Sequence, residues 1–193
     1  MTIDTDYGRF PAIARFDKVA FGQFVEDMRK CFDDQLMGAD DLVDIYNRIR
    51  KPERKTRGSA GYDFSSPIDI RLNPGEVVTI PTGIRVKISP NYVLMMYMRS
   101  GLGFKHGLRL INGTGIIDSD YYESDNQGHI MIKLINDSSV GHTVEIRQGD
   151  GIAQGIFVPF GLAIDDKASG IRNGGFGSTD HNKEKTHDKN RLV

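Results

Sequence analysis

The sequence predicts an all-β sandwich or barrel that carries a helical insertion near its N-terminus. From Ala60 onward, apolar and polar residues alternate with a period of two in several short runs, which is the pattern of half-buried strands. Turn signals such as Asn73-Pro74-Gly75 and Gln148-Gly149-Asp150 separate these runs. No long helix stands between strands after residue 60, which disfavours a doubly wound sheet. Many short strands at this spacing therefore indicate a sandwich or barrel.

The strands are expected in six segments, namely residues 78–80, 84–88, 93–98, 130–135, 144–146 and 152–158. Before them the period is that of an α-helix. One run follows the i, i+3, i+4, i+7 pattern, with Phe21, Phe24, Val25, Met28 and Cys31 on one face. A second run follows Asp40, a candidate N-cap, and places Leu42, Ile45, Tyr46 and Ile49 together. We expect a helical hairpin over residues 21–49 whose apolar face packs on the protein rather than forming a partner groove.

The chain of 193 residues suits one domain with an appended helical piece. We divide it into an N-terminal extension (1–57), a β-barrel core (58–168) and a glycine-rich C-terminal arm and tail (169–193). Six of the ten residues from 48 to 57 are basic. A solvated linker is the favoured interpretation of this run, and a contribution to a phosphate site is the alternative.

Composition excludes several classes of protein. A formal net charge of −1 argues against a broad polyanion-binding surface, so no nucleic-acid partner is expected. The single cysteine, Cys31, fits a reducing compartment. No apolar run is long enough for a membrane span and no leader peptide is apparent. These features predict a soluble, cytoplasmic protein without a membrane partner.

The stretch from residue 111 to 122 concentrates groups that suit a polar ligand. It combines the amide of Asn112 with Gly113 and Gly115, and then adds Asp118 and Tyr121. We expect a β-hairpin whose backbone approaches a flat ring, whose amide reads one edge of that ring and whose aromatic side chain lies against a sugar. The carboxylate could take a proton from water. An ordinary acidic turn is the alternative.

Other candidate groups lie elsewhere in the chain. Arg99-Ser100-Gly101 follows an expected strand and offers donors to phosphate oxygens, although such a tripeptide is usually a turn. Gln154 is a polar residue in an apolar strand. The segment 174–179 combines a ring with hydroxyls and accessible amides, which suits a nucleotide clamp or a flexible linker. The five histidines have no metal-ligand spacing, so any metal would be a hard ion carried by substrate phosphates.

Taken together, these pieces resemble the five ordered motifs of the trimeric deoxyuridine triphosphatases (dUTPases). The resemblance covers roughly residues 58–180. The similar segments are Ala60-Gly61-Tyr62-Asp63-Phe64, Arg99-Ser100-Gly101-Leu102, Gly115-Ile116-Ile117-Asp118-Ser119-Asp120-Tyr121, Gly149-Asp150-Gly151-Ile152-Ala153-Gln154 and Asn173-Gly174-Gly175-Phe176-Gly177-Ser178-Thr179.

The resemblance implies a jelly-roll or distorted β-barrel, assembled as a homotrimer with shared active sites. It implies an enzyme that hydrolyses dUTP to dUMP and pyrophosphate, which limits uracil in DNA and supplies dUMP. Asp118 would be the general base, and Mg²⁺ would bind the triphosphate, with Asp63 reaching it at most through water. The implied substrate-binding residues are Arg99, Ser100, Gly101, Asn112, Gly115, Ile117, Tyr121, Met131, Gln154, Arg172, Phe176, Gly177, Ser178 and Thr179.

Four departures from the family pattern stand out. They are the helical insertion at 21–49, a lengthened turn at 122–126, Gly151 in place of a common basic residue, and Arg172 one position closer than usual to Phe176. The two insertions motivate the alternative of a dUTPase-like protein that docks a regulator. A dCTP deaminase shares the fold, but Lys133 stands where its glutamate is needed, which disfavours deamination. A bacterial or a phage source stays open.

Overall fold

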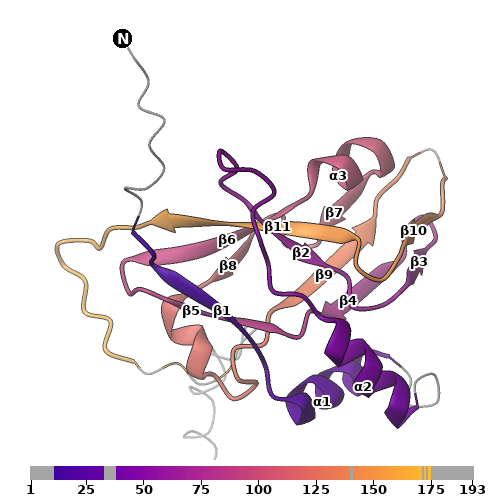
Figure 1. Ribbon diagram of the computed structural model, residues 1–193. Helices are drawn as coiled ribbons and strands as arrows, with labels where there is room; N and C mark the ends of the chain where they lie inside the picture. The colour runs from indigo at the N-terminus through magenta and orange to yellow at the C-terminus, as the bar shows by residue number, and fades with distance from the viewer. Residues whose placement is uncertain (1–10, 33–37, 140, 171, 173, 175–193) are drawn as a thin grey trace, which may run out of the picture.

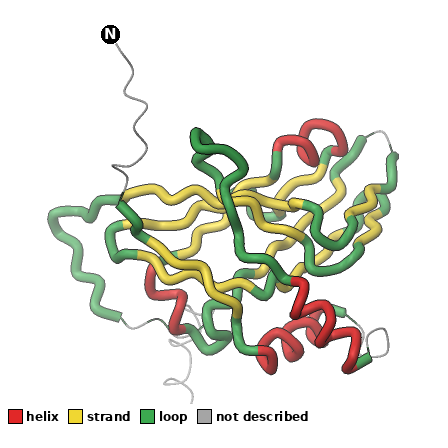
Figure 2. Tube along the Cα trace, viewed as in Figure 1, coloured by secondary structure: helices red, strands yellow, loops and turns green. Residues whose placement is uncertain are grey.

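The computed structural model describes residues 11–32, 38–139, 141–170, 172 and 174. In this part of the chain the strands form the body and the helices lie around it (Figure 1). Figure 2 shows the same arrangement by type of secondary structure. The helical elements are α1 (Phe21–Cys31), α2 (Ala39–Arg48), α3 (Ser100–His106) and the 3-10 helix η3 (Ser119–Glu123). The strands are β1 (Ala14–Lys18), β2 (Tyr62–Ser65), β3 (Ile70–Leu72), β4 (Val77–Pro81), β5 (Ile84–Ile88), β6 (Tyr92–Met98), β7 (Leu108–Leu110), β8 (Gly115–Ile117), β9 (Met131–Asn136), β10 (Val144–Ile146) and β11 (Gly151–Pro159).

The strands form one four-stranded sheet, one three-stranded sheet and two strand pairs. The larger sheet has the order β2-β11-β6-β8, the smaller has β4-β9-β7, and the pairs are β1-β5 and β3-β10. Every pairing is antiparallel. All six strands expected from the sequence are present, within two residues at each end. The all-β prediction is confirmed.

Alternating residues of the strands meet in one apolar core. β5 buries Ile84, Val86 and Ile88, while β9 buries Ile132 and Leu134. Burying a side chain of this size contributes about 1.5–3 kcal/mol, so the period of two fixes which face of each strand turns inward.

The helices α1 and α2 lie side by side at the lower right of Figure 1, and α1 also contacts β4. Their apolar faces enter the main core through Phe24, Met28 and Leu42, as the helical periodicity predicts. The cap of α2 differs from the expectation. Gly38 rather than Asp40 is the N-cap, and its amide donates to Oδ2 of Asp41 at 3.0 Å. The reason is that the helix begins two residues earlier than an Asp40 cap implies, at Ala39, which places the carboxylate of Asp41 at its third position.

Two local features differ from what the sequence suggested. The alternative that Arg99-Ser100-Gly101 is only a turn does not hold, because α3 begins at Ser100 and ends at His106. Its C-cap, Gly107, has a φ of 67°, the left-handed conformation that favours glycine. The stretch around Gly113 is not a paired hairpin. β7 pairs with β9 and β8 pairs with β6, so the turn between them joins two different sheets. Short strands flanking a glycine turn look alike in sequence whether or not they pair with each other.

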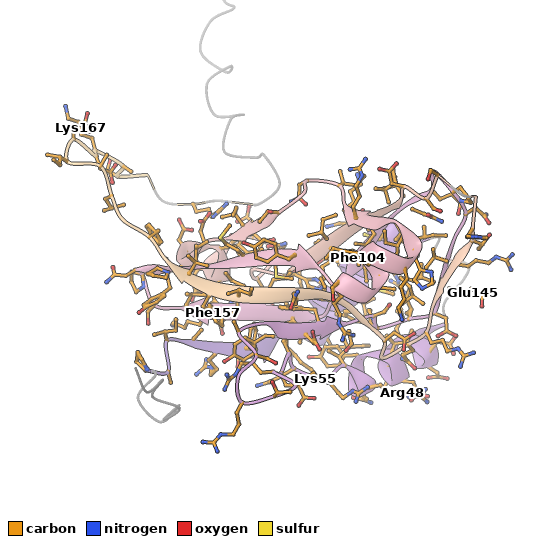
Figure 3. All side chains as sticks on the ribbon, turned by 90° about the horizontal axis from the view of Figure 1, so that it is seen from above. Arg48, Lys55, Phe104, Glu145, Phe157 and Lys167 are labelled. Carbon is orange, nitrogen blue, oxygen red and sulfur yellow. The ribbon has the colours of Figure 1, made fainter. Side chains whose placement is uncertain are left out.

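After β11 the described chain, residues 160–170, has no strand or helix and is exposed throughout. Lys167 lies on this segment, away from the strands (Figure 3). Leu162 and Ile164 are among its exposed apolar side chains. Within the described residues, no helix is both long and apolar enough to cross a membrane.

Candidate active site

A pocket of about 310 Å³ opens between β8, β9 and the turn after β7. Six of the residues expected to bind substrate line it, namely Asn112, Gly115, Ile117, Tyr121, Met131 and Arg172. Its other lining residues include Met96, Ile111 and Lys133, which were not predicted. Met96 belongs to β6, Lys133 to β9 and Ile111 to the turn after β7, so only the folded arrangement of these elements could have identified them.

Gly115 keeps the pocket open by lying close to the neighbouring strand. It pairs with Met96 of β6, and a Cβ atom at residue 115 would lie 3.1 Å from the Cβ of Met96. The Cβ atom added at residue 115 would also lie 3.8 Å from the side-chain amide nitrogen of Asn112. A side chain at 115 would therefore crowd Met96 of β6 and lie in contact with the amide that is expected to bind the ligand.

Tyr121 forms a buried wall of the pocket and is only 5% exposed. Its hydroxyl donates to the carbonyl oxygen of His129 at 2.9 Å and accepts from Nδ2 of Asn126 at 2.9 Å. Burial raises the pKa of this phenol, although the Asn126 hydrogen bond and the charge of Arg172 oppose that effect. The ring is therefore held as a neutral, fixed surface.

Asp118 follows β8 directly and is the N-cap residue of η3. Its side chain is 46% exposed and accepts a hydrogen bond from Nη1 of Arg172 at 2.6 Å. The same nitrogen lies 3.1 Å from Oδ1 of Asp120, and the guanidinium lies 5.4 Å from the centre of the Tyr121 ring. Burial lowers the pKa of Arg172, but the hydrogen bonds with Asp118 and Asp120 outweigh it and the pKa is raised. A solvent-accessible carboxylate thus stands beside the pocket, with a permanent cation against it.

A second group of predicted residues gathers on the larger sheet. Nε of Arg99 lies 3.4 Å from Oδ1 of Asp63, and Gln154 of β11 pairs with Asp63 of β2. Ser100 and Gly101 follow Arg99 as the first residues of α3. Candidate phosphate contacts from two parts of the sequence, Arg99-Ser100-Gly101 and Gln154, therefore meet beside Asp63, because β2, β11 and β6 are neighbours.

Two glycines leave room for this second group. A Cβ atom at Gly61 would lie 2.4 Å from Oε1 of Gln154, and one at Gly151 would lie 2.2 Å from Nη1 of Arg99. Both distances are shorter than real contacts. Gly151, which departs from the family pattern, is therefore the residue that allows Arg99 to lie over the start of β11 and reach Asp63.

The two groups are far apart within one chain. Ile117, which precedes Asp118, pairs with Leu94 of β6, whereas Arg99 directly follows the last residue of that strand. Strands rise by about 3.3 Å per residue, so Arg99 and Asp118 are separated by roughly 15 Å or more along β6. A single chain does not bring the carboxylate and the phosphate contacts together.

The remaining predicted residues, Phe176, Gly177, Ser178 and Thr179, lie outside the described residues. Among the described residues, no group of three or more His, Cys, Asp or Glu side chains could hold a metal ion. Asp63 is already engaged by Arg99. This donor set fits a metal carried by a ligand's phosphates better than one caged by protein side chains.

Comparison with known proteins identifies the class of this fold. A family model described as dUTPase matches residues 47–179. This range is most of the chain, and the chain therefore belongs to the dUTPase family. The family resemblance drawn from the five motifs is confirmed.

Individual relatives of known name also belong to the dUTPase family. The chain is 42% identical over 134 residues to the deoxyuridine 5'-triphosphate nucleotidohydrolase of Lactococcus lactis, an alignment that covers 68% of this chain and 88% of that protein. It is also 42% identical over 149 residues to the Haemophilus ducreyi protein of the same name, covering 71% and 93%.

Solved structures with a similar fold are dUTPases as well. The dUTPase of Streptococcus mutans superposes with a TM-score of 0.57 at 30% identity, over 78% of this chain and 98% of that one. A variant of the dUTPase from phage phi11 of S. aureus, which coordinates a structural Mg(II) ion, superposes with a TM-score of 0.52 at 27% identity, over 64% and 92%. The predicted jelly-roll class is confirmed.

Proposed function

We propose that this protein is a dUTP diphosphatase that hydrolyses dUTP to dUMP and pyrophosphate. The observation that supports it most is the pocket lined by Asn112, Gly115 and Tyr121, with the accessible carboxylate of Asp118 beside it. Membership of the dUTPase family and the names of the relatives support the same reaction. Such an activity removes dUTP before uracil enters DNA and provides dUMP for dTMP synthesis.

In this proposal the pocket takes the deoxyuridine. The amide of Asn112 and the backbone around Gly115 and Ile117 read uracil, with Met131 against the base. The ring of Tyr121 packs against the deoxyribose and leaves no space for a 2'-hydroxyl. Its low exposure and its two hydrogen bonds make it a rigid wall, which is what rejection of one extra oxygen requires.

The chemical step is proton removal from water by Asp118. The water oxygen attacks the α-phosphorus, the bond from that phosphorus to the α–β bridging oxygen breaks, and pyrophosphate leaves. The protein supplies positioning and charge more than covalent chemistry in this kind of reaction. Asp118 suits the role because it is exposed to water and lies beside the pocket rather than inside it.

Arg99, Ser100, Gly101 and Gln154 bind the phosphates in this proposal. Mg²⁺ on the triphosphate neutralises part of its charge. Asp63 reaches that ion at most through water, since its carboxylate already meets Arg99. Arg172 and, beyond the described residues, Phe176, Gly177, Ser178 and Thr179 complete the site from the C-terminal arm.

We further propose that the protein is a homotrimer whose active sites are shared. The separation of roughly 15 Å along β6 between Arg99 and Asp118 supports it, because one chain cannot present both to one nucleotide. A second copy that places its Asp118 pocket beside the Arg99 group would complete the site. Closed cyclic assembly gives every copy the same role.

Two alternatives are weaker. Lys133 lines the pocket where a dCTP deaminase needs a glutamate, and a lysine cannot shuttle the protons of deamination. The regulator-docking alternative was motivated by the insertions at 21–49 and 122–126. Both insertions pack against the rest of the chain. The helices bury Phe24, Met28 and Leu42 in the core, and the turn packs on β5.

The direct test is pyrophosphate release from dUTP, dTTP, dCTP and UTP in parallel, each with Mg²⁺. The proposal expects release from dUTP alone. Release from none of the four would remove the catalytic proposal, and release from dCTP with ammonia would favour the deaminase.

A further inference from the structure

The two insertions that depart from the family pattern meet at a single buried histidine. His129 follows the lengthened turn and is fully buried. Its Nδ1 lies 2.7 Å from Oδ2 of Asp27, a residue of α1. Helix α1 and the turn after Tyr121 are more than ninety residues apart in the sequence, yet this contact joins them.

The hydrogen bonds of His129 indicate which ring nitrogen carries the proton. Its Nε2 accepts the amide hydrogen of Gly83 at 2.7 Å, so that nitrogen carries a lone pair. The proton therefore sits on Nδ1 and points at Asp27. Asp27 is itself buried, 6% exposed, and its Oδ2 also accepts from Nε2 of Gln23 at 2.9 Å. The imidazole is fixed at both nitrogens.

The backbone of His129 also holds the side chain of Tyr121 in place. The His129 carbonyl accepts from the Tyr121 hydroxyl at 2.9 Å, and Nδ2 of Asn126 reaches both groups. The same turn is tied to the start of α1, because the amide of Ala20 donates to Oε1 of Gln127 at 2.9 Å. Two residues, Gln127 and His129, therefore tie the turn to the helical insertion.

We infer that Asp27 and His129 are positioning residues for the nucleotide pocket, through which helix α1 sets the place of the Tyr121 ring. The helices of the insertion thus act in sugar discrimination although none of them lines the pocket. A longer turn has more freedom than a tight one, and the Asp27–His129 hydrogen bond removes that freedom. This inference rests on the proposed function, since it assigns the pocket to deoxyuridine.

The test compares Asp27→Ala with two variants of the same helix. Asp27→Asn keeps an acceptor for Nδ1 of His129. Met28→Ala removes a buried side chain of α1 that has no hydrogen bond to His129, and so matches the loss of stability. KM, kcat and the dUTP-to-UTP ratio of kcat/KM are measured for each, together with the affinity for dUMP by calorimetry.

We expect Asp27→Ala to raise KM for dUTP by about tenfold and to lower the dUTP-to-UTP ratio, within the coupling range of one hydrogen-bond network. Asp27→Asn should keep KM and the dUTP-to-UTP ratio close to their wild-type values. Met28→Ala should lower apparent kcat through the folded fraction and leave KM and the ratio unchanged. In a Tyr121→Phe background, where the hydroxyl link is missing, Asp27→Ala should add little.

Several results would overturn the inference. One is an Asp27→Ala variant that behaves like Met28→Ala. Another is a tenfold effect that persists in the Tyr121→Phe background. The dUMP affinities separate this inference from the proposed function: a wild-type protein that binds dUMP without hydrolysing dUTP removes the function only, and weaker dUMP binding by Asp27→Ala would still support the inference. A wild-type protein that binds no nucleotide overturns both.

Discussion

At the scale of single residues, Asp118 differs from the neighbouring carboxylates in its surroundings. Asp118 and Asp120 share the guanidinium of Arg172, but Asp118 lies closer to it, at 2.6 Å against 3.1 Å. Asp118 also directly follows β8, whose last residue, Ile117, pairs with Leu94 of β6. These features distinguish a carboxylate held at the pocket from one on the surface.

Asp118→Asn should abolish hydrolysis and keep nucleotide binding, because an amide fills the same space without acting as a base. The expected loss in kcat is about 100-fold or more. Pyrophosphate release and dUMP calorimetry check the two parts separately. Asp120→Asn is the matched control and should stay within about threefold of wild type. Equal losses in both variants would mean that the pair holds Arg172 and that neither is the base.

Gly151→Ala should move the side chain of Arg99, since the new Cβ atom would overlap its guanidinium. Loss of a charge-assisted contact of Arg99 predicts a KM for dUTP that is about five- to thirtyfold higher. The fold should survive, because a flexible side chain rather than backbone must shift. Steady-state kinetics and thermal unfolding together check this, and an unchanged KM would show that Arg99 does not bind substrate.

The sequence suggested the candidate site residues that lie in one short stretch, but not the contacts between distant elements that support them. The stretch from residue 111 to 122 made Asn112, Asp118 and Tyr121 candidates, because an amide, a carboxylate and a ring stand close together around two glycines. His129 gave no such signal, since a lone histidine in an apolar run has no partner nearby in sequence. Asp27, its partner, belongs to another element. Pairs of this kind are visible only once the chain has folded.

At the scale of elements, period-two alternation predicted β4, β5, β6, β9, β10 and β11 and missed five strands. β3, β7 and β8 have three residues each, which is too few to establish a period without a clear turn signal beside them, and β1 and β2 were missed as well. The missed helix α3 begins with Ser100-Gly101, a pair that is typical of turns, and most of it is exposed. Its position is set by the strands on either side rather than by its own propensity.

The link from α1 to His129 should appear in the dependence of stability on pH. Burial raises the pKa of Asp27, but its hydrogen bonds with His129 and Gln23 outweigh burial, so the pKa lies below the usual 3.8. A carboxyl group with a depressed pKa binds fewer protons when folded. Its contribution is therefore complete above the unfolded pKa and is lost as the pH falls below about 4.

Asp27→Asn should accordingly lower the free energy of unfolding at neutral pH by about 1 kcal/mol and lose less on acidification than wild type. Thermal or urea unfolding at neutral pH and at about pH 3 measures both. Glu26→Gln, which changes the exposed carboxyl group next to it, should keep the wild-type pH dependence. Parallel curves for wild type and Asp27→Asn would contradict the assignment of Asp27.

At the scale of the whole molecule, the fold distributes the proposed site over both ends of β6. The Arg99 group belongs to the neighbouring strands β2, β11 and β6, and the Asp118 pocket belongs to β8 and β9. The exposed segment 160–170 leads away from the strands toward the C-terminal arm (Figure 3). In the proposed trimer, a second copy would bring the missing half of each site.

The most direct test of this account is complementation between two inactive chains. Arg99→Ala and Asp118→Asn, each with little activity at dUTP concentrations well below KM, are coexpressed with different tags and the mixed trimers are isolated. If each site takes Arg99 from one copy and Asp118 from another, every mixed trimer should carry one complete site, which is about a third of the wild-type sites. We predict that recovery of dUTP hydrolysis. Mixed oligomers that stay inactive would show that both residues serve one chain, and would contradict the shared site.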